Sequence, residues 1–199
     1  MSSTTLGSIA VISWNVNGFK TRRADLEELI FEHSPDVLCL QETKTPSGCR
    51  LALLGYSAYR FDRDTRSGGV AILVKPGVDH CFLGTDSGVT MDNISIELST
   101  ATGPVKITSL YKSPQQLLER DDIQSLVGSD VPTIALGDLN CKSPAWNSRM
   151  ANANGRRLEE WADDFGAVVV GPLEPSYIPY GRGLPDVLDI VKSSCKKQL

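Results

Sequence analysis

Polar residues that could carry chemistry follow or interrupt short apolar runs in this sequence. The oxygens of Glu and Asp, without Cys or His ligands in the set, suit a hard cation such as Mg²⁺. A carboxylate can accept a proton from water, an Asn amide can orient that carboxylate, and a Tyr hydroxyl can donate to developing negative charge. Together with a metal, such groups could hydrolyse a phosphodiester. The set comprises Asn15, Asn17, Glu42, Tyr111, Asp138, Asn140 and Asp189.

Each of these residues also has a simpler interpretation. Asn and Asp at strand ends commonly form turns, and Glu42 could cap a helix or face solvent. Asp189, inside the apolar run VLDIV, is harder to explain in this way because a buried carboxylate needs a partner. His33 and His80 are expected to be structural. Spacing alone therefore leaves a metal site and ordinary turn chemistry both open.

The elements that must position these residues are short apolar strands separated by polar turns, with a few amphipathic helices. The opening is β-α-β and the middle section is mostly antiparallel. This pattern favours an α/β or α+β fold in which two sheets pack face to face with helices outside. Helices are expected at 22–33, 115–126 and 156–165. Strands are expected at 9–14, 37–41, 57–61, 69–74, 78–83, 94–98, 105–110, 133–136 and 167–170, with a last, incomplete one at 187–191.

Bulk properties limit the class of protein. The 199 residues suit one domain, and the net charge of −4 argues against a generic nucleic-acid coating protein. Any DNA contact must therefore use a local basic patch. The five cysteines are odd in number and form no CxxC pair, which indicates free thiols in a reducing compartment. No apolar run approaches a membrane span and the start lacks a signal-peptide pattern, so we expect an intracellular protein.

A set of motifs resembles the endonuclease/exonuclease/phosphatase superfamily. The strongest likeness is to the apurinic-like endonuclease domains of non-LTR (LINE-type) retrotransposons of the jockey group. The motifs follow the family's order and cover nearly the whole chain, and AWNS and PSYIPYGRG favour retrotransposons over repair enzymes. They are SWNVNG (13–18), PDVLCLQET (35–43), RSGGVAILV (66–74), SLYKSP (109–114), ALGDLNCKSPAWNS (135–148), NANGRRLEEW (152–161) and PSYIPYGRGLPDVLDIV (175–191).

The resemblance implies an α/β fold, a four-layered sandwich of two mainly antiparallel β-sheets flanked by helices, as in DNase I. It implies Mg²⁺ or Mn²⁺ as cofactor and nicking of double-stranded DNA to leave a 3′-hydroxyl and a 5′-phosphate. In a retrotransposon, that 3′-hydroxyl primes a reverse transcriptase domain of the parent polyprotein, which implies action in the nucleus. Another chemistry of the superfamily, on sugar phosphates or lipid phosphodiesters, is disfavoured by the retrotransposon-like motifs.

The same resemblance implies roles for individual residues. Glu42 matches the main metal ligand, with Asn15 beside it. Asp138 matches the residue that activates the attacking water, and Asn140 the partner that fixes this aspartate and contacts phosphate. The tyrosine that contacts the scissile phosphate corresponds to Tyr111, and the aspartate that pairs with a catalytic histidine corresponds to Asp189.

Contacts to DNA are expected from polar and basic side chains in loops. Asn17 stands where many repair relatives have Asp, so its role at a metal is doubtful and it is grouped with the DNA contacts. For each basic residue, a solvated surface charge is the simpler interpretation. The candidates are Asn17, Lys20, Arg22, Arg23, Arg60, Arg63, Arg66, Lys112 and Arg182.

One departure from the resembling family concerns the C-terminal part. Family members carry a further strand and a Ser-Asp-His segment some tens of residues after the position of Asp189, whereas this sequence runs ten residues past it, to Leu199. We therefore expect the catalytic histidine and one core strand to be missing. The activity would be weakened, or the domain would be an inactive remnant that binds nucleic acid or a partner.

Overall fold

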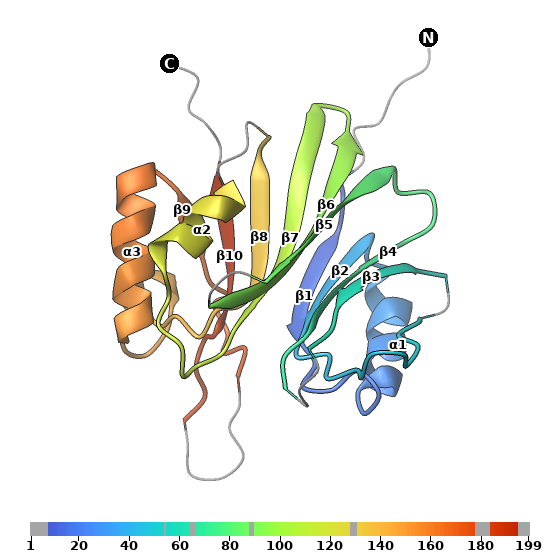
Figure 1. Cartoon of the computed structure of the whole chain (residues 1–199), viewed down its shortest axis with the longest axis horizontal. Coiled ribbons are helices and arrows are strands. Elements are labelled where there is room, and N and C mark those ends of the chain that lie inside the picture. Colours follow the sequence, from blue (N-terminus) through green and yellow to red (C-terminus); the bar gives the residue numbers. More distant parts are fainter. Residues whose placement is uncertain are drawn as a thin grey trace.

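Two β-sheets face each other at the centre of the molecule, and helices cover their outer faces (Figure 1). The computed structural model describes residues 8–53, 55–63, 67–87, 90–127, 131–177 and 184–194. The first sheet has the order β1-β2-β4-β3 and the second the order β5-β6-β7-β8-β10-β9. The pairs β1–β2 and β7–β8 are parallel and the remaining pairs are antiparallel.

The strands and helices have the following bounds. The first sheet contains β1 (Val11–Asn15), β2 (Val37–Gln41), β3 (Ser57–Phe61) and β4 (Val70–Val74). The second contains β5 (His80–Ser87), β6 (Met91–Thr100), β7 (Gly103–Lys112), β8 (Thr133–Asp138), β9 (Val168–Val170) and β10 (Asp189–Ser194). The helices are α1 (Arg23–His33), α2 (Arg120–Val127) and α3 (Ala153–Phe165), with a short 3₁₀ helix, η1 (Pro144–Trp146).

Three apolar cores fill the three spaces between four layers. One core, around Leu26 and Leu38, lies between α1 and the first sheet. The central core, around Ile72 and Ile96, lies between the sheets, and a third, around Trp161, joins the second sheet to α2 and α3. This arrangement confirms the expected four-layered sandwich. No helix in the described part of the chain is long and apolar enough to cross a membrane.

Several expected element boundaries were wrong by a few residues, and three of these differences affect the site. The expected helix at 115–126 begins only at Arg120, because turns occupy the chain after β7, including one closed by the Gln116 amide on the Ser113 carbonyl. The helix expected from residue 156 begins at Ala153, because the Asn152 side chain caps it by accepting from the Gly155 amide at 2.7 Å. The last strand begins at Asp189, which is therefore at the strand's start rather than inside it.

Gly137 allows β8 to lie against β7 at the point where the chemistry-bearing residues begin. It pairs with Leu110 in the parallel ladder and has a φ of +149°. A Cβ at this position would lie 2.0 Å from the Leu110 carbonyl oxygen. Since that neighbour is backbone, a side chain here would push the strand ends, and with them Asp138, away from Tyr111.

We predict that Gly137→Ala destabilises the fold by about 1–3 kcal/mol or more, because the methyl group overpacks a backbone contact. Urea unfolding followed by tryptophan fluorescence measures this change. Gly84→Ala is the matched control, since Gly84 also has a strongly positive φ, +129°, but has no atom within 4 Å of its would-be Cβ. Equal losses in the two variants would show that backbone strain, and not the close approach, makes Gly137 necessary.

Candidate active site

The ends of five strands meet at one edge of the sandwich. In the second sheet, Tyr111, Asp138 and Asp189 occupy one row across β7, β8 and β10, because Asp138 is in register with both of the others. In the first sheet, Asn15 on β1 is in register with Gln41, the residue before Glu42. The two sheets pack so that these ends come together, which confirms the expected convergence of Asn15, Glu42 and Asp138.

Asn15 connects the two carboxylates that belong to different sheets. Its side-chain nitrogen donates to Glu42 Oε1 at 3.2 Å and to Asp138 Oδ2 at 2.8 Å. Its oxygen, the atom that would ligate a cation, accepts from the Asn17 amide at 3.1 Å. Asn15 therefore orients the carboxylates, and since its oxygen keeps a second lone pair, its expected role as a metal ligand stays a prediction.

The backbone around Glu42 is held in a conformation that L-residues rarely adopt. Glu42 has a φ of +49°, in the left-handed region. The loop that follows is fixed by the RSGG motif, because the Thr43 and Lys44 amides donate to the carbonyls of Gly69 and Gly68, each at 3.1 Å. Strain of this kind persists only where the surroundings enforce it, and here it points the Glu42 side chain into the cleft.

Glu42 is ionised and has partners on both oxygens. Burial opposes its ionisation, but the Lys44 ammonium, 2.8 Å from Oε2, and the Asn15 amide outweigh this effect and lower the pKa of Glu42.

The Tyr111 hydroxyl is also hydrogen-bonded to Glu42. Burial, followed by the charge of Glu42, raises the pKa of Tyr111, so the phenol keeps its proton. Tyr111 is only 5% exposed and is not among the residues that line the cleft. Its hydrogen bond supports Glu42, and its expected contact with a phosphate stays a prediction.

Asp138 is the most perturbed carboxylate at this edge. It is buried, and burial together with the nearby charge of Asp189 raises its pKa to about 7. Its Oδ1 accepts from the Asn140 backbone amide at 2.9 Å. Asn140, itself in the left-handed region with a φ of +49°, donates from its side chain to the Lys112 carbonyl at 2.9 Å. Asn140 thus fixes Asp138, as expected.

One carboxylate oxygen of Asp189 lacks a hydrogen bond to any residue that the structure describes. This atom, Oδ1, is buried. The Ser176 hydroxyl anchors the backbone here by accepting from the Leu188 and Asp189 amides at 3.0 and 3.1 Å. Burial raises the pKa of Asp189. The lone oxygen fits the expectation that Asp189 serves a partner, and neither His33 nor His80 is among the cleft-lining residues.

These side chains border a cleft of about 650 Å³. Among the described residues, no group of three or more His, Cys, Asp or Glu side chains is close enough to hold a metal ion unaided. Mg²⁺ does not need such a cage, because it is commonly bound by one or two carboxylates, waters and substrate phosphates. The oxygen donors therefore fit a hard cation. The lining residues are Asn15, Asn17, Arg22, Glu42, Pro114, Asp138, Asn140, Lys142, Asn152, Ser176, Tyr177, Leu188 and Asp189.

The polar residues expected to bind DNA fall into different groups. Asn17 and Arg22 line the cleft. Lys20, which lies between them in the sequence, is exposed. Arg23 is exposed on α1, where it pairs with Glu27 at 2.9 Å. Arg66 and Arg182 lie outside the described residues.

Three basic residues are already engaged within the protein. Lys112 is wholly buried, and its ammonium donates to the carbonyls of Ser113 and Gln116 at 2.8 and 3.0 Å. The expectation that Lys112 contacts DNA was therefore wrong. Arg63 makes two hydrogen bonds, at 2.7 and 2.8 Å, to the buried carboxylate of Asp92. Arg60 pairs with Asp62 at 2.6 Å. Both arginine side chains are still partly exposed, so their expected contact with DNA stays a prediction.

Two residues that hold the site in place by hydrogen bonds, Asn152 and Gln41, were not identified from the sequence. Asn152 received no role from the sequence, yet its side chain donates to the Asn140 carbonyl at 2.9 Å and accepts from the Lys142 amide at 3.0 Å. Gln41 donates to Ser109 Oγ at 3.0 Å and so connects the first sheet to β7 beneath the site. Such contacts span many residues of sequence and leave no periodic signal.

Comparison with known proteins places this geometry in a family. The family model described as Endonuclease/Exonuclease/phosphatase family matches residues 12–190. The chain is 27% identical over 191 residues to the RNA-directed DNA polymerase from mobile element jockey of Drosophila funebris, covering 93% of this chain and 21% of that protein. It thus spans about one fifth of that relative's length.

Two solved structures share the fold. The endonuclease domain of TRAS1, a telomere-specific non-LTR retrotransposon, superposes with a TM-score of 0.74 at 18% identity, covering 92% of this chain and 83% of that one. The APE2 catalytic domain of Xenopus laevis gives a TM-score of 0.68 at 15% identity, with coverage of 93% and 82%. With a family model that covers nearly all of its sequence, the chain belongs to the endonuclease/exonuclease/phosphatase family.

Proposed function

We propose that this domain is a Mg²⁺- or Mn²⁺-dependent endonuclease that nicks one strand of double-stranded DNA and leaves a 3′-hydroxyl. The observation that carries the proposal is the meeting of Glu42, Asp138 and Asp189 at one edge, with one amide, that of Asn15, bridging the first two. Similarity to retrotransposon proteins supports DNA as the substrate. It also supports a setting in which the 3′-hydroxyl primes a reverse transcriptase of the same polyprotein in the nucleus.

The chain's own residues suit this chemistry. Asp138 has a pKa near neutrality, which is the range in which a carboxylate can accept a proton from an attacking water. Glu42 stays ionised and is the carboxylate best placed to hold a divalent cation. A bound cation would polarise the scissile phosphate and stabilise charge on its oxygens. The fixed Asn140 turn keeps Asp138 from rotating out of position.

We predict that Glu42→Gln and Asp138→Asn each lower the rate of supercoiled plasmid nicking in Mg²⁺ by about 10²-fold or more, since each removes a charge acting on the reacting groups. Glu32→Gln is the matched control, because Glu32 is an exposed residue of α1. It should nick like the wild type. Nicking that survives in the Glu42 and Asp138 variants would contradict the proposed site.

A second candidate function is favoured by the Asp189 oxygen that lacks a hydrogen bond to the described residues. If that carboxylate requires a donor from another segment to act, this domain binds DNA without cleaving it. Duplex binding without nicking by the wild type, at any Mg²⁺ or Mn²⁺ concentration, would favour this second function over the first.

The raised pKa of Asp138 also predicts a pH dependence of stability. In the unfolded chain this carboxyl loses its proton near pH 4, whereas in the folded protein it retains the proton up to about pH 7. The group therefore contributes its full stability below pH 4 and loses it as the pH rises to 7. In EDTA, the free energy of unfolding of the wild type should fall relative to that of Asp138→Asn across this range.

Urea unfolding at several pH values measures this difference, and Mg²⁺ should reduce it because a cation favours the ionised carboxylates. If the wild type gained stability relative to Asp138→Asn between pH 4 and 7 in EDTA, Asp138 would not be the crowded, proton-retaining carboxyl inferred above.

A further inference from the structure

Lys142 is a cation in the cleft that has no role in the reaction proposed above. It follows Asn140 by two residues and lines the same cleft as Asp138 and Asp189. Among the described residues that line this cleft, the cations are Lys142 and Arg22. Arg22 is exposed and pairs with the exposed Asp25, whereas Lys142 is held by a buried partner, Asp186.

The backbone of Lys142 is clamped on both sides. Its amide donates to Asn152 Oδ1 at 3.0 Å, and its carbonyl accepts from the Asn152 amide at 3.0 Å. Gly155, in the first turn of α3, lies so close that a Cβ there would be 1.7 Å from the Lys142 carbonyl oxygen. The NANG motif thus serves to fix this residue.

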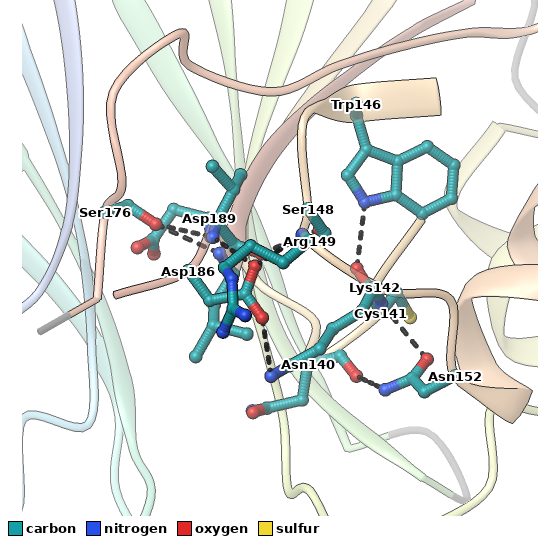
Figure 2. Close-up of polar contacts among 12 residues, drawn as sticks. Asn140, Cys141, Lys142, Trp146, Ser148, Arg149, Asn152, Ser176, Asp186 and Asp189 are labelled. Atoms are coloured by element: carbon teal, nitrogen blue, oxygen red, sulfur yellow. Dashed lines mark hydrogen bonds and ion pairs between the residues drawn. The ribbon is translucent and has the colours of Figure 1, made fainter. Parts of the chain in front are cut away.

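The side chain of Lys142 is fixed by Asp186. The ammonium lies 2.8 Å from Asp186 Oδ2, while Asp186 Oδ1 accepts from the Arg149 and Val187 amides at 2.9 and 3.0 Å (Figure 2). The Ser148 hydroxyl donates to the Val187 carbonyl at 2.9 Å and so fixes the residue that follows Asp186. Residues of the AWNS motif (145–148) and of the segment LPDVLD (184–189) therefore contact each other around Asp186, the partner of Lys142.

The ion pair with the buried Asp186 carboxylate fixes the Lys142 side chain, which is still 35% exposed and lines the cleft, so its ammonium can be reached by a ligand there. An ammonium has three N–H donors. Among the described residues Lys142 uses one of them, on Asp186, so two remain for a group in the cleft.

We propose that Lys142 binds a phosphate of the DNA on the Asn140 side of the cleft, and that Asp186 is the positioning residue that holds its ammonium there. The inference rests on the proposed function, since it assumes a DNA substrate. A fixed ammonium in the cleft that the three carboxylates also line would offset part of the repulsion that a phosphate meets there. Because phosphates carry no base identity, the contact would give affinity and register rather than sequence choice.

The test uses the whole chain and a fluorescein-labelled mixed-sequence DNA duplex, with anisotropy measured in EDTA over a series of NaCl concentrations. Lys142→Met keeps the aliphatic stem and removes the charge. It should weaken binding several-fold and reduce the slope of log affinity against log salt by about 0.9, the loss of one phosphate contact. Lys75→Met is the matched control, because Lys75 is also hydrogen-bonded, to Ser34, but does not line the cleft. It should change neither quantity.

Asp186→Asn separates positioning from charge. The Lys142 ammonium keeps its charge but loses the carboxylate that positions it. The slope of log affinity against log salt should therefore stay near the wild-type value, while nicking should slow by about tenfold or more. If Lys142→Met fails to fold, acetylation of the wild type with an N-hydroxysuccinimide ester answers the same question. DNA should protect Lys142 and leave Lys75 reactive.

The outcomes separate the two proposals. A wild type that binds and nicks DNA, with an unchanged salt slope in Lys142→Met or an unprotected Lys142, would overturn the role of Lys142 and leave the proposed function standing. A wild type that neither binds nor nicks DNA would overturn both.

Discussion

Mutual repulsion among three carboxylates is the constraint on which the rest of this structure depends. Glu42, Asp138 and Asp189 come from different strand ends, and the pKa of Asp138 is raised partly because the other two are close. Asn15 keeps the first two together by donating to both. Such crowding costs free energy in the absence of a cation, and it is typical of sites where charge is arranged for function rather than for stability.

The fold holds this cluster in place from several directions. Gly137 allows β8 to approach β7, so that Asp138 lies beside Tyr111. The Gly68 and Gly69 carbonyls hold the loop after Glu42 in place. Glu42 and Asn140, which follow the ends of β2 and β8, have strained backbone conformations that neighbouring segments enforce.

Much of the fold and part of the site could be predicted from sequence. Strands such as Val37–Gln41 and Ser57–Phe61 have the predicted bounds, because apolar runs between turn residues define them directly. Glu42, Asp138 and Asn140 were found as polar residues at strand ends. The remaining features depend on contacts between distant segments. Lys112 looks like a surface lysine in SLYKSP, but the turn after β7 encloses it, and Lys142 and Asp186 lie 44 residues apart in the chain.

The central claim is that the crowded carboxylates exist to hold a hard divalent cation against a phosphate. Crystals soaked in Mn²⁺ and measured at a wavelength that gives anomalous scattering from manganese test it most directly. We predict one strong anomalous peak in the cleft, about 2–2.3 Å from a carboxylate oxygen of Glu42, with waters completing the shell. A crystal saturated with Mn²⁺ that shows no peak beside Glu42 or Asp138, or a peak only at another part of the surface, would contradict the account.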